Sequence, residues 1–498
     1  MENHFNHPQR QSKIGIIVLF ADSLQKYARG FLPIAFLFIL KGDAFNALYL
    51  YLGLLAIVVI VGLIAYLSYI NFTFYIDNQK EEFIISKGIF NKTKTSIQLN
   101  KIQQVNLSQN IIHRIINVYA LDVDTAGSDN KEANIKAVSH QMALALKSKL
   151  LENENKTTTE FTQIANPKTN LSAPFLKIDL VSLFKIGITS NYARTIGLIL
   201  TFFFTIIDVV SQAGKTDVVS SDNLNSLIEN NPIIYVILMF IVAMFAVVFI
   251  LNIARTVIKF FGYTVAKQKG SLVLSYGLIN TKSTILKPEK VQITKVSSNY
   301  FQNKLNVLEI NIKQAVGHAD NKNKNSIEIP GCNSQEANEI MKLLFKELPQ
   351  KGEMLKPNFR KLGFSLFLLF ILPLSVFYSL GHWVKPVIFD YVSIAVFYAV
   401  AITILLSFGF RNYRLFVNND FIIKQSGAWD VDKEIIQIEK IQALTTSQLF
   451  WHKNINIGSL TLHTAGGNIT FYLGKFDRIN QLVNLWLYKI ETQNSNWM

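Results

Sequence analysis

The stretch that decides the fold reads LYLYLGLLAIVVIVGLIAYLSYI, from Leu48 to Ile70, and it contains no charged residue over 23 positions. A helix needs about 20 apolar residues to cross the hydrocarbon core of a bilayer. Three further uncharged runs have comparable length, at Ile233–Ala254, Leu362–Leu380 and Tyr391–Phe410. The four runs therefore predict membrane-spanning helices.

Two shorter apolar runs are Phe31–Leu40, which contains Pro33, and Thr195–Ile207. Each is too short to span a bilayer by itself, so a buried or interfacial helix is the alternative. The motif Tyr-Ala-Arg precedes both runs, at residues 27–29 and 192–194. On this repetition we predict that both are spans, which arranges six helices as three hairpins.

Charge is distributed unevenly along the chain. Only 17% of the residues are charged, against about 25% in a typical soluble domain. The three predicted hairpin loops, at residues 41–47, 211–232 and 381–386, hold three of the 49 basic residues. The positive-inside rule then places both termini and all soluble segments on the cytoplasmic side of the cell membrane. The net charge of +15 is expected to face anionic lipid rather than nucleic acid.

The same set of short motifs follows each predicted hairpin. The set consists of a Gly that ends an apolar strand, a Lys-Ile/Val-Gln triplet that begins 13 residues later, and a second Gly that lies 39, 40 and 39 residues after the first. The motif residues are Gly88, Lys101, Gln103 and Gly127; Gly277, Lys290, Gln292 and Gly317; and Gly427, Lys440, Gln442 and Gly466. Such constant spacing predicts three copies of one structural module.

Each copy is predicted to be rich in β-strands. Alternating apolar residues, such as Leu121 with Val123 and Leu460 with Leu462, put one face of a strand inward. The first Gly of each copy is expected in a turn that requires positive φ. Apolar residues at helical spacing close each copy, so we expect an amphipathic helix over one face of the sheet. The stripes are Val138, Met142, Ala145, Leu146 and Leu150 in the first copy, with looser spacing; Ala337, Ile340, Met341, Leu344, Phe345 and Leu348 in the second; and Ile479, Leu482, Val483, Trp486, Leu487 and Ile490 in the third.

The order of Gly, Lys-Ile/Val-Gln and Thr-Ala-Gly resembles the bacterial pleckstrin-homology (PH)-like domain. Three such modules, each behind a helix pair, resemble the YdbT-like family of membrane proteins over roughly residues 20 to 490. The resemblance implies a bent antiparallel sheet capped by a C-terminal helix, and it implies no established reaction. The second module departs from the motif, because Gln-Ala-Val-Gly replaces Thr-Ala-Gly at residues 314–317.

The predicted fold class is therefore membrane α-helical hairpins plus α+β modules. The predicted parts are a cytoplasmic N-terminal segment (1–26), hairpin 1 (27–70), module 1 (71–152), a linker (153–175), a pre-membrane segment with hairpin 2 (176–254), module 2 (255–350), a linker (351–361), hairpin 3 (362–410) and module 3 (411–491).

An apolar pair with a basic residue recurs about ten residues after each triplet. The three segments contain Ile111, Ile112 and Arg114; Tyr300, Phe301 and Lys304; and Phe450, Trp451 and Lys453. One interpretation is a docking site for the membrane or a partner, because rings and basic side chains suit the headgroup layer. The other is a short helix that packs its apolar side into the core of its module.

The Lys-Ile/Val-Gln triplets also allow two interpretations. On a strand, the middle residue points inward while Lys and Gln point to solvent. The alternative is a polar surface that binds a peptide or a neighbouring module.

Motifs for catalysis or for cofactor binding are not found in the sequence, and the single cysteine, Cys332, excludes an internal disulfide. We therefore expect a non-enzymatic membrane scaffold without cofactor or small-molecule substrate, which binds lipid, protein partners or copies of itself. A role in envelope homeostasis is an analogy with the resembling family alone. A transporter or transport accessory protein that uses the six spans is the alternative.

Overall fold

A computed structural model describes residues 5–27, 47–125, 133–152, 175–190, 231–268, 271–314 and 326–492, together with residues 197 and 201. The predicted span at 31–40, most of the one at 195–207, and the motif glycines at 127 and 317 lie outside these ranges. The chain forms two compact units. Unit 1 contains residues 1–175, 264–290 and 314–325, and unit 2 contains residues 176–263, 291–313 and 326–498. The division falls inside predicted module 2.

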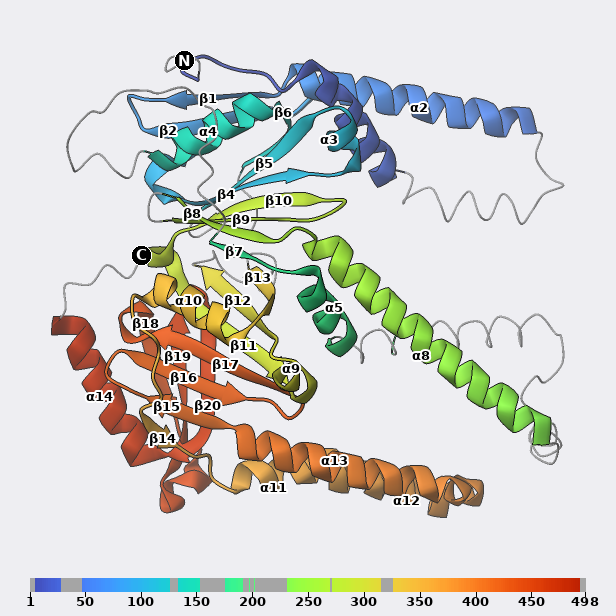
Figure 1. Cartoon of the computed structure of the whole chain (residues 1–498), viewed down its shortest axis with the longest axis vertical. Helices are drawn as coiled ribbons and strands as arrows, with labels where there is room; N and C mark the ends of the chain where they lie inside the picture. The colour runs from blue at the N-terminus through green and yellow to red at the C-terminus, as the bar shows by residue number, and fades with distance from the viewer. Residues whose placement is uncertain are drawn as a thin grey trace. The chain divides into compact units, whose positions relative to one another are not determined.

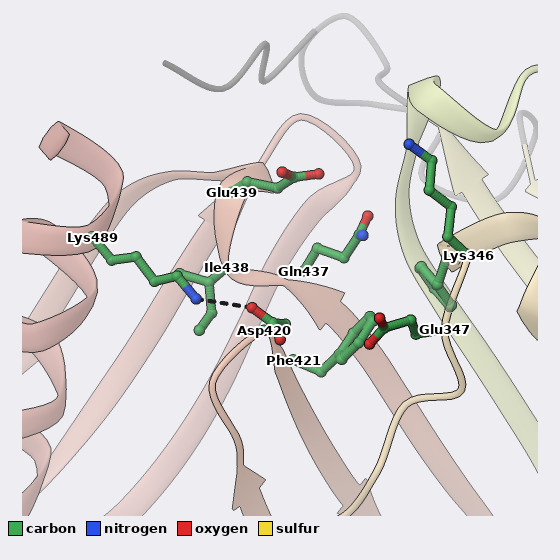
Figure 2. A pocket seen from close by; sticks show the side chains of 9 residues that line it. Lys346, Glu347, Asp420, Phe421, Gln437, Ile438, Glu439 and Lys489 are labelled. Carbon is green, nitrogen blue, oxygen red and sulfur yellow. Dashed lines mark hydrogen bonds and ion pairs between the residues drawn. The ribbon is translucent and has the colours of Figure 1, made fainter. Parts of the chain in front are cut away.

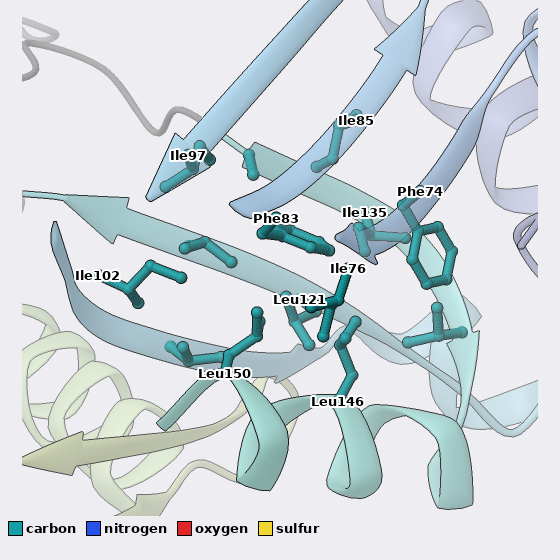
Figure 3. Close-up of a cluster of buried hydrophobic side chains, with 14 of the residues drawn as sticks. Phe74, Ile76, Phe83, Ile85, Ile97, Ile102, Leu121, Ile135, Leu146 and Leu150 are labelled. Carbon is teal, nitrogen blue, oxygen red and sulfur yellow. The ribbon is translucent and has the colours of Figure 1, made fainter. Parts of the chain in front are cut away.

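Module 1 lies wholly in unit 1 and consists of a three-stranded sheet, three further antiparallel strands that belong to a larger sheet, and a closing helix. Its elements are β1 (Thr73–Asp77), β2 (Glu82–Lys87), β3 (Thr93–Gln98), β4 (Ile102–Gln109), α3 (Ile111–Ile115), β5 (Val118–Thr125), β6 (Ala133–Ser139) and α4 (His140–Glu152). The core between the sheets and α4 contains Phe74, Phe83, Leu121 and Leu146, all fully buried (Figure 3). This arrangement confirms the antiparallel strands and the capping helix.

Modules 2 and 3 repeat the order of elements. Module 2 has β8 (Thr264–Gln268), β9 (Ser271–Tyr276) and β10 (Thr281–Leu286) in unit 1, then β11 (Val291–Asn299), α9 (Tyr300–Lys304), β12 (Leu308–Gln314), β13 (Ser326–Cys332) and α10 (Ser334–Phe345). Module 3 has β14 (Glu353–Leu355), β15 (Arg414–Val417), β16 (Phe421–Ser426), β17 (Asp430–Gln437), β18 (Ile441–Ser447), η7 (Phe450–Ile455), β19 (Ile457–Thr464), β20 (Gly467–Lys475) and α14 (Phe476–Thr492). The core of module 3 is built around Trp486 and Phe471.

The predicted glycine turns are present in all three modules. Gly88, Gly277 and Gly427 have φ angles of +118°, +114° and +112°. A Cβ atom at any of them would overlap a backbone carbonyl oxygen three residues further on. Glycine is therefore required here, and the turn fixes how the second strand of each module returns as the third.

The sheets do not stop at the module boundaries, which the sequence did not predict. In unit 1, strands follow the order β6-β5-β4-β10-β9-β8, and in unit 2 the order is β13-β12-β11-β17-β16-β15-β14 (Figure 1). The link between modules 1 and 2 is the antiparallel pairing of β4 with β10, here called joint 1. The link between modules 2 and 3 is the antiparallel pairing of β11 with β17, here called joint 2.

Two helical segments in unit 2 are long and apolar enough to cross a membrane, Arg360–Trp383 and Pro386–Asn412. The first comprises α11 (Arg360–Leu366), a π-helical turn (Phe367–Ile371) and α12 (Leu372–Trp383), and the second ends with α13 (Val392–Asn412). They correspond to the third predicted hairpin (Figure 1), and no residue in the most apolar 18-residue window of either segment is buried by the described residues. The first and second long runs are also helical, in α2 (Ala47–Ile70) and α8 (Asn231–Phe260). The layout of six spans stays a prediction.

Candidate interaction sites

The three predicted docking segments form the short helices α3, α9 and η7, which follow strands β4, β11 and β18. The side chains of Asn110 and Asn299 cap α3 and α9 by accepting hydrogen bonds from backbone N–H groups. The paired apolar residues are partly or largely exposed, at 54% and 37% in α3, 58% and 49% in α9, and 75% and 51% in η7. The second interpretation requires these apolar pairs to fill the cores of their modules. Their exposure shows that they do not.

A polar residue is buried in each of these turns instead. His113, Gln302 and His452 are at most 8% exposed and lie one position after the apolar pair. The ring nitrogen Nε2 of His113 lies 2.8 Å from the carbonyl oxygen of Lys136. These three residues were not predicted from the sequence, although each lies 25 residues after the turn glycine of its module, a constant distance that could have identified them.

Two of the docking segments touch the next module within their own unit. At joint 1, Nη1 of Arg114 donates to the carbonyl oxygen of Leu278, 3.1 Å away, in the turn before β10. At joint 2, the ring of Phe301 packs on Trp429, in the turn before β17, with centroids 5.7 Å apart. Arg114 at the tip of α3 and Phe301 at the tip of α9 therefore contribute to contacts between modules. Lys304 lies over the ring of Tyr300, and η7 keeps Phe450 and Trp451 exposed.

The Lys-Ile/Val-Gln triplets also belong to the joints. Their middle residues, Ile102, Val291 and Ile441, are buried as predicted. Nζ of Lys290 donates to the carbonyl oxygen of Ile102 in module 1, at 3.2 Å. The expectation that Lys and Gln point to solvent is wrong for Lys440 and Gln292, which are 4% and 2% exposed. Both lie beside joint 2 and outside its paired residues, and the Gly466 turn of module 3 lies against the side chain of Gln292.

Joint 1 also contains a buried lysine from the closing helix of module 1. Nζ of Lys147 on α4 lies 3.2 Å from Oγ of Ser283 on β10. Burial lowers the pKa of Lys147 from 10.5 to about 8, because the charged form loses hydration.

A polar cluster in unit 2 links the end of α5 (Leu180–Thr189) to module 2. Nδ2 of Asn299 donates to the carbonyl oxygen of Thr189 at 2.8 Å, and Nε2 of Gln302 donates to Oγ of Ser190 at 2.9 Å. Oγ of Ser190 donates in turn to Glu309 at 2.9 Å. Burial raises the pKa of the Glu309 carboxyl, whereas the hydrogen bond from Ser190 opposes this rise.

A hollow of ≈ 340 Å³ lies where the end of α10 meets module 3 (Figure 2). Its lining is Phe345, Lys346, Glu347, Asp420, Phe421, Gln437, Ile438, Glu439 and Lys489. Nζ of Lys489 bonds to Asp420 at 2.9 Å, and the rings of Phe345 and Phe421 meet edge to face. The lining carries both signs of charge, and two of its charges already neutralise each other, so the hollow is not a cradle for an ion of one sign.

Within the described ranges, no group of three or more His, Cys, Asp and Glu side chains could hold a metal ion. Cys332 is buried and free, and burial raises the pKa of its thiol.

These features define a protein of repeated PH-like modules linked to apolar helices. Residues 31–154, 202–348 and 367–488 match the family described as bacterial PH domain, so the chain belongs to that family. It is similar to the UPF0699 transmembrane protein YdbT of Bacillus subtilis (strain 168), with 23% identity over 453 residues that cover 87% of this chain and 85% of the relative. The chain is thus a YdbT-like transmembrane protein with bacterial PH domains.

Proposed function

We propose that this protein is a non-enzymatic scaffold of the cell membrane, whose PH-like modules lie on the cytoplasmic side and bind partners at the inner leaflet. One observation carries the proposal. The tips of α3 and α9 contact the next module, whereas the equivalent tip, η7, exposes Phe450 and Trp451. Exposed aromatic side chains beside a base, here Lys453, are typical of an interaction surface.

The orientation can be tested with introduced cysteines, because the native Cys332 is 0% exposed and should react little with thiol reagents. Lys385→Cys places a thiol between the two apolar helices of unit 2, and Asn91→Cys places one in the first glycine turn of module 1. In right-side-out vesicles, an impermeant maleimide should label the first variant, and should label the second only after the membrane is opened. Equal labelling of both variants in closed vesicles would show the orientation to be wrong.

The binding role can be tested on the full chain in mild detergent. Phe450→Ser combined with Trp451→Ser should reduce the recovery of co-purified proteins or lipids by about tenfold or more, which is the cost of two hot-spot side chains. The matched control is Ile115→Ser on α3, which removes an apolar side chain that is 78% exposed and should leave recovery unchanged. An unchanged melting temperature would show that both variants fold.

The same preparations distinguish a scaffold from a transporter. Proteoliposomes of the wild-type chain should show no solute flux above that of empty vesicles. Solute flux, or identical co-purified material from the wild type and the double variant, would overturn the proposal.

A further inference from the structure

The two joints have the same register when residues are counted from the turn glycine of each module. At joint 1, Thr281 lies four residues after Gly277 and pairs with Gln109, which lies 21 residues after Gly88. At joint 2, Val431 lies four residues after Gly427 and pairs with Ser298, which lies 21 residues after Gly277. The third strand of one module therefore meets the fourth strand of the preceding module by a fixed rule.

Each joint adds side-chain contacts of its own near the turn glycine of the next module. Arg114 reaches the carbonyl one residue after the next turn glycine, and Phe301 packs on Trp429, the second residue after it. Across the ladders, Thr284 donates to Asn106 at 2.7 Å in joint 1, and Lys295 pairs with Asp432 at 2.7 Å in joint 2.

Two strand edges equivalent to those in the joints are open in the part of the chain that the structure describes. There, β3 pairs with β2 alone, and β18 pairs with β19 alone. Most side chains of β18 are exposed, whereas those of β11, which joint 2 covers, are buried or half-buried. Open edges of this kind are templates for pairing with another strand.

Other edges are covered by segments of the chain itself. The outer edge of β1 is bridged by Gln9, whose backbone exchanges two hydrogen bonds with Phe74. The outer edge of β15 is covered by β14, and Asn358 donates to Leu473 of β20. In the described part of the chain, β3 and β18 are therefore the third and fourth strands that lack the partner their equivalents have in the joints.

The register rule brings compatible residues of β18 and β3 together. It sets Ser447 opposite Thr93, Thr445 opposite Thr95 and Leu444 opposite Ser96, so like charges do not face each other. It also sets Trp451 against Phe90, at the positions of Phe301 and Trp429. Phe90 is 99% exposed, which is the exposure expected of an aromatic side chain whose partner lies on another molecule.

We propose that β18 and η7 of one copy pair with β3 and the Gly88 turn of a second copy, forming a third joint between molecules. The inference rests on the proposed scaffold function and names its partner. In this joint Lys453 takes the position of Arg114 and reaches the carbonyl of Ile89, and Lys101 takes the position of Lys290 and reaches the carbonyl of Ile441. The contact is heterologous, so its repetition yields a closed ring or an open row of molecules in the membrane.

The test is cross-linking between two differently tagged full-length chains that are expressed together. One chain carries Thr445→Cys and the other carries Thr95→Cys. Mild oxidation of the membranes should join them, because residues directly opposite in an antiparallel ladder are close enough for a disulfide. The matched control replaces Thr95→Cys by Lys94→Cys. A shift of one residue turns the side chain to the other face of the strand, so the control should not link.

Two further variants make a negative result interpretable. Asn106→Cys with Thr284→Cys in one chain probes the same position inside joint 1, and it should link within the chain. Phe90→Ser, added to the Thr95→Cys chain, should lower the yield of linked chains by about fivefold through loss of the aromatic contact.

The inference is overturned if the pair within joint 1 links while Thr445→Cys and Thr95→Cys do not, or if the Lys94→Cys control links equally well. If this happens while the Phe450→Ser/Trp451→Ser variant still loses its co-purified material, the scaffold proposal stands and its partner is not a second copy. If the cross-link between copies is absent and the Phe450→Ser/Trp451→Ser variant also keeps its co-purified material, both proposals are overturned.

Discussion

The hydroxyl of Tyr398 donates a hydrogen bond to the backbone carbonyl oxygen of Leu369, 2.5 Å away on the neighbouring apolar helix. Leu369 lies four residues before Pro373, which has no N–H to offer that carbonyl. A π-helical turn, Phe367–Ile371, precedes the proline. In hydrocarbon an unpaired carbonyl is costly, so a side chain from the partner helix takes the place of the missing donor.

The first prediction follows from this bond. Tyr398→Phe should destabilise the hairpin by about 1 kcal/mol, because it leaves the Leu369 carbonyl without a donor. The measurement is the melting temperature of the full chain in detergent. In a Pro373→Ala background, where the helix again has an N–H at that position, the same change should cost much less. If Tyr398→Phe lowered the melting temperature equally in both backgrounds, the tyrosine hydroxyl would not be compensating for the missing N–H of Pro373.

The second prediction concerns the turn glycines. Gly277→Ala should destabilise unit 1 by about 1–3 kcal/mol or more, since φ is +114° and the added Cβ overlaps the carbonyl of Asn280. Gly363→Ala is the control, because that glycine is helical and has open space around its Cβ position. Thermal unfolding of both variants checks the difference, and a tolerated Gly277→Ala would contradict the described turn.

The third prediction is a pH dependence set by Lys147. Its folded-state pKa of about 8 lies below the model-peptide value of 10.5, so the unfolded chain binds more protons between these two values. Below pH 8 both states are charged and the burial penalty is complete. Stability should therefore rise from pH 8 to 10.5. Lys147→Met should raise the melting temperature at pH 7, and this advantage should shrink as the pH passes through that window.

A second lysine variant supplies the baseline for that experiment. Lys94→Met removes an exposed lysine from β3, so its effect on the melting temperature should be small and should show no such trend. If Lys147→Met gave the same shift at pH 7 and pH 10.5, burial of the ammonium group would not be the cause.

The fourth prediction compares two equivalent aromatic residues, Trp429, which packs on Phe301, and Phe90, which is exposed. Trp429→Ala should destabilise unit 2 by about 1 kcal/mol beyond the effect of lost area, because its ring packs on Phe301 at joint 2. Phe90→Ala changes the equivalent position of module 1, where the ring is 99% exposed, and should leave the stability of dilute chains unchanged. Melting temperatures in excess detergent check both, and a large loss with Phe90→Ala would show that Phe90 has a partner within the chain.

Much of the local structure could be read from the order of the residues. Gly88, Gly277 and Gly427 indicated the turns, because only glycine adopts their backbone conformation without strain. The stripe that includes Ile479, Leu482 and Trp486 predicted the face that α14 buries in module 3. In α4 the prediction was poorer. Leu146 and Leu150 are buried as predicted, but Ala145 is exposed, Val138 lies in β6, and Ala143 is buried without having been predicted, since a loosely spaced stripe does not define the phase of a helix.

The candidate sites were predicted less completely. The recurring apolar pairs were recognised as a shared feature, but the sequence did not distinguish a buried pair from an exposed one. Lys440 and Gln292 were expected in solvent and are buried, since the local pattern of residues does not show which distant segment of the fold will cover them.

The sequence by itself determined the apolar helices, the triple repeat and the turns, because each depends on residues that are close together in the chain. The helices follow from the length of the apolar runs, the repeat from the constant spacing of its motifs, and the turns from the backbone conformation that only glycine adopts without strain. Only the tertiary structure decided that β4 pairs with β10 and β11 with β17, which joins the modules through continuous sheets. Strand edges bond through backbone groups that every residue except proline carries in full, so side chains along one strand do not specify which distant strand will be its partner.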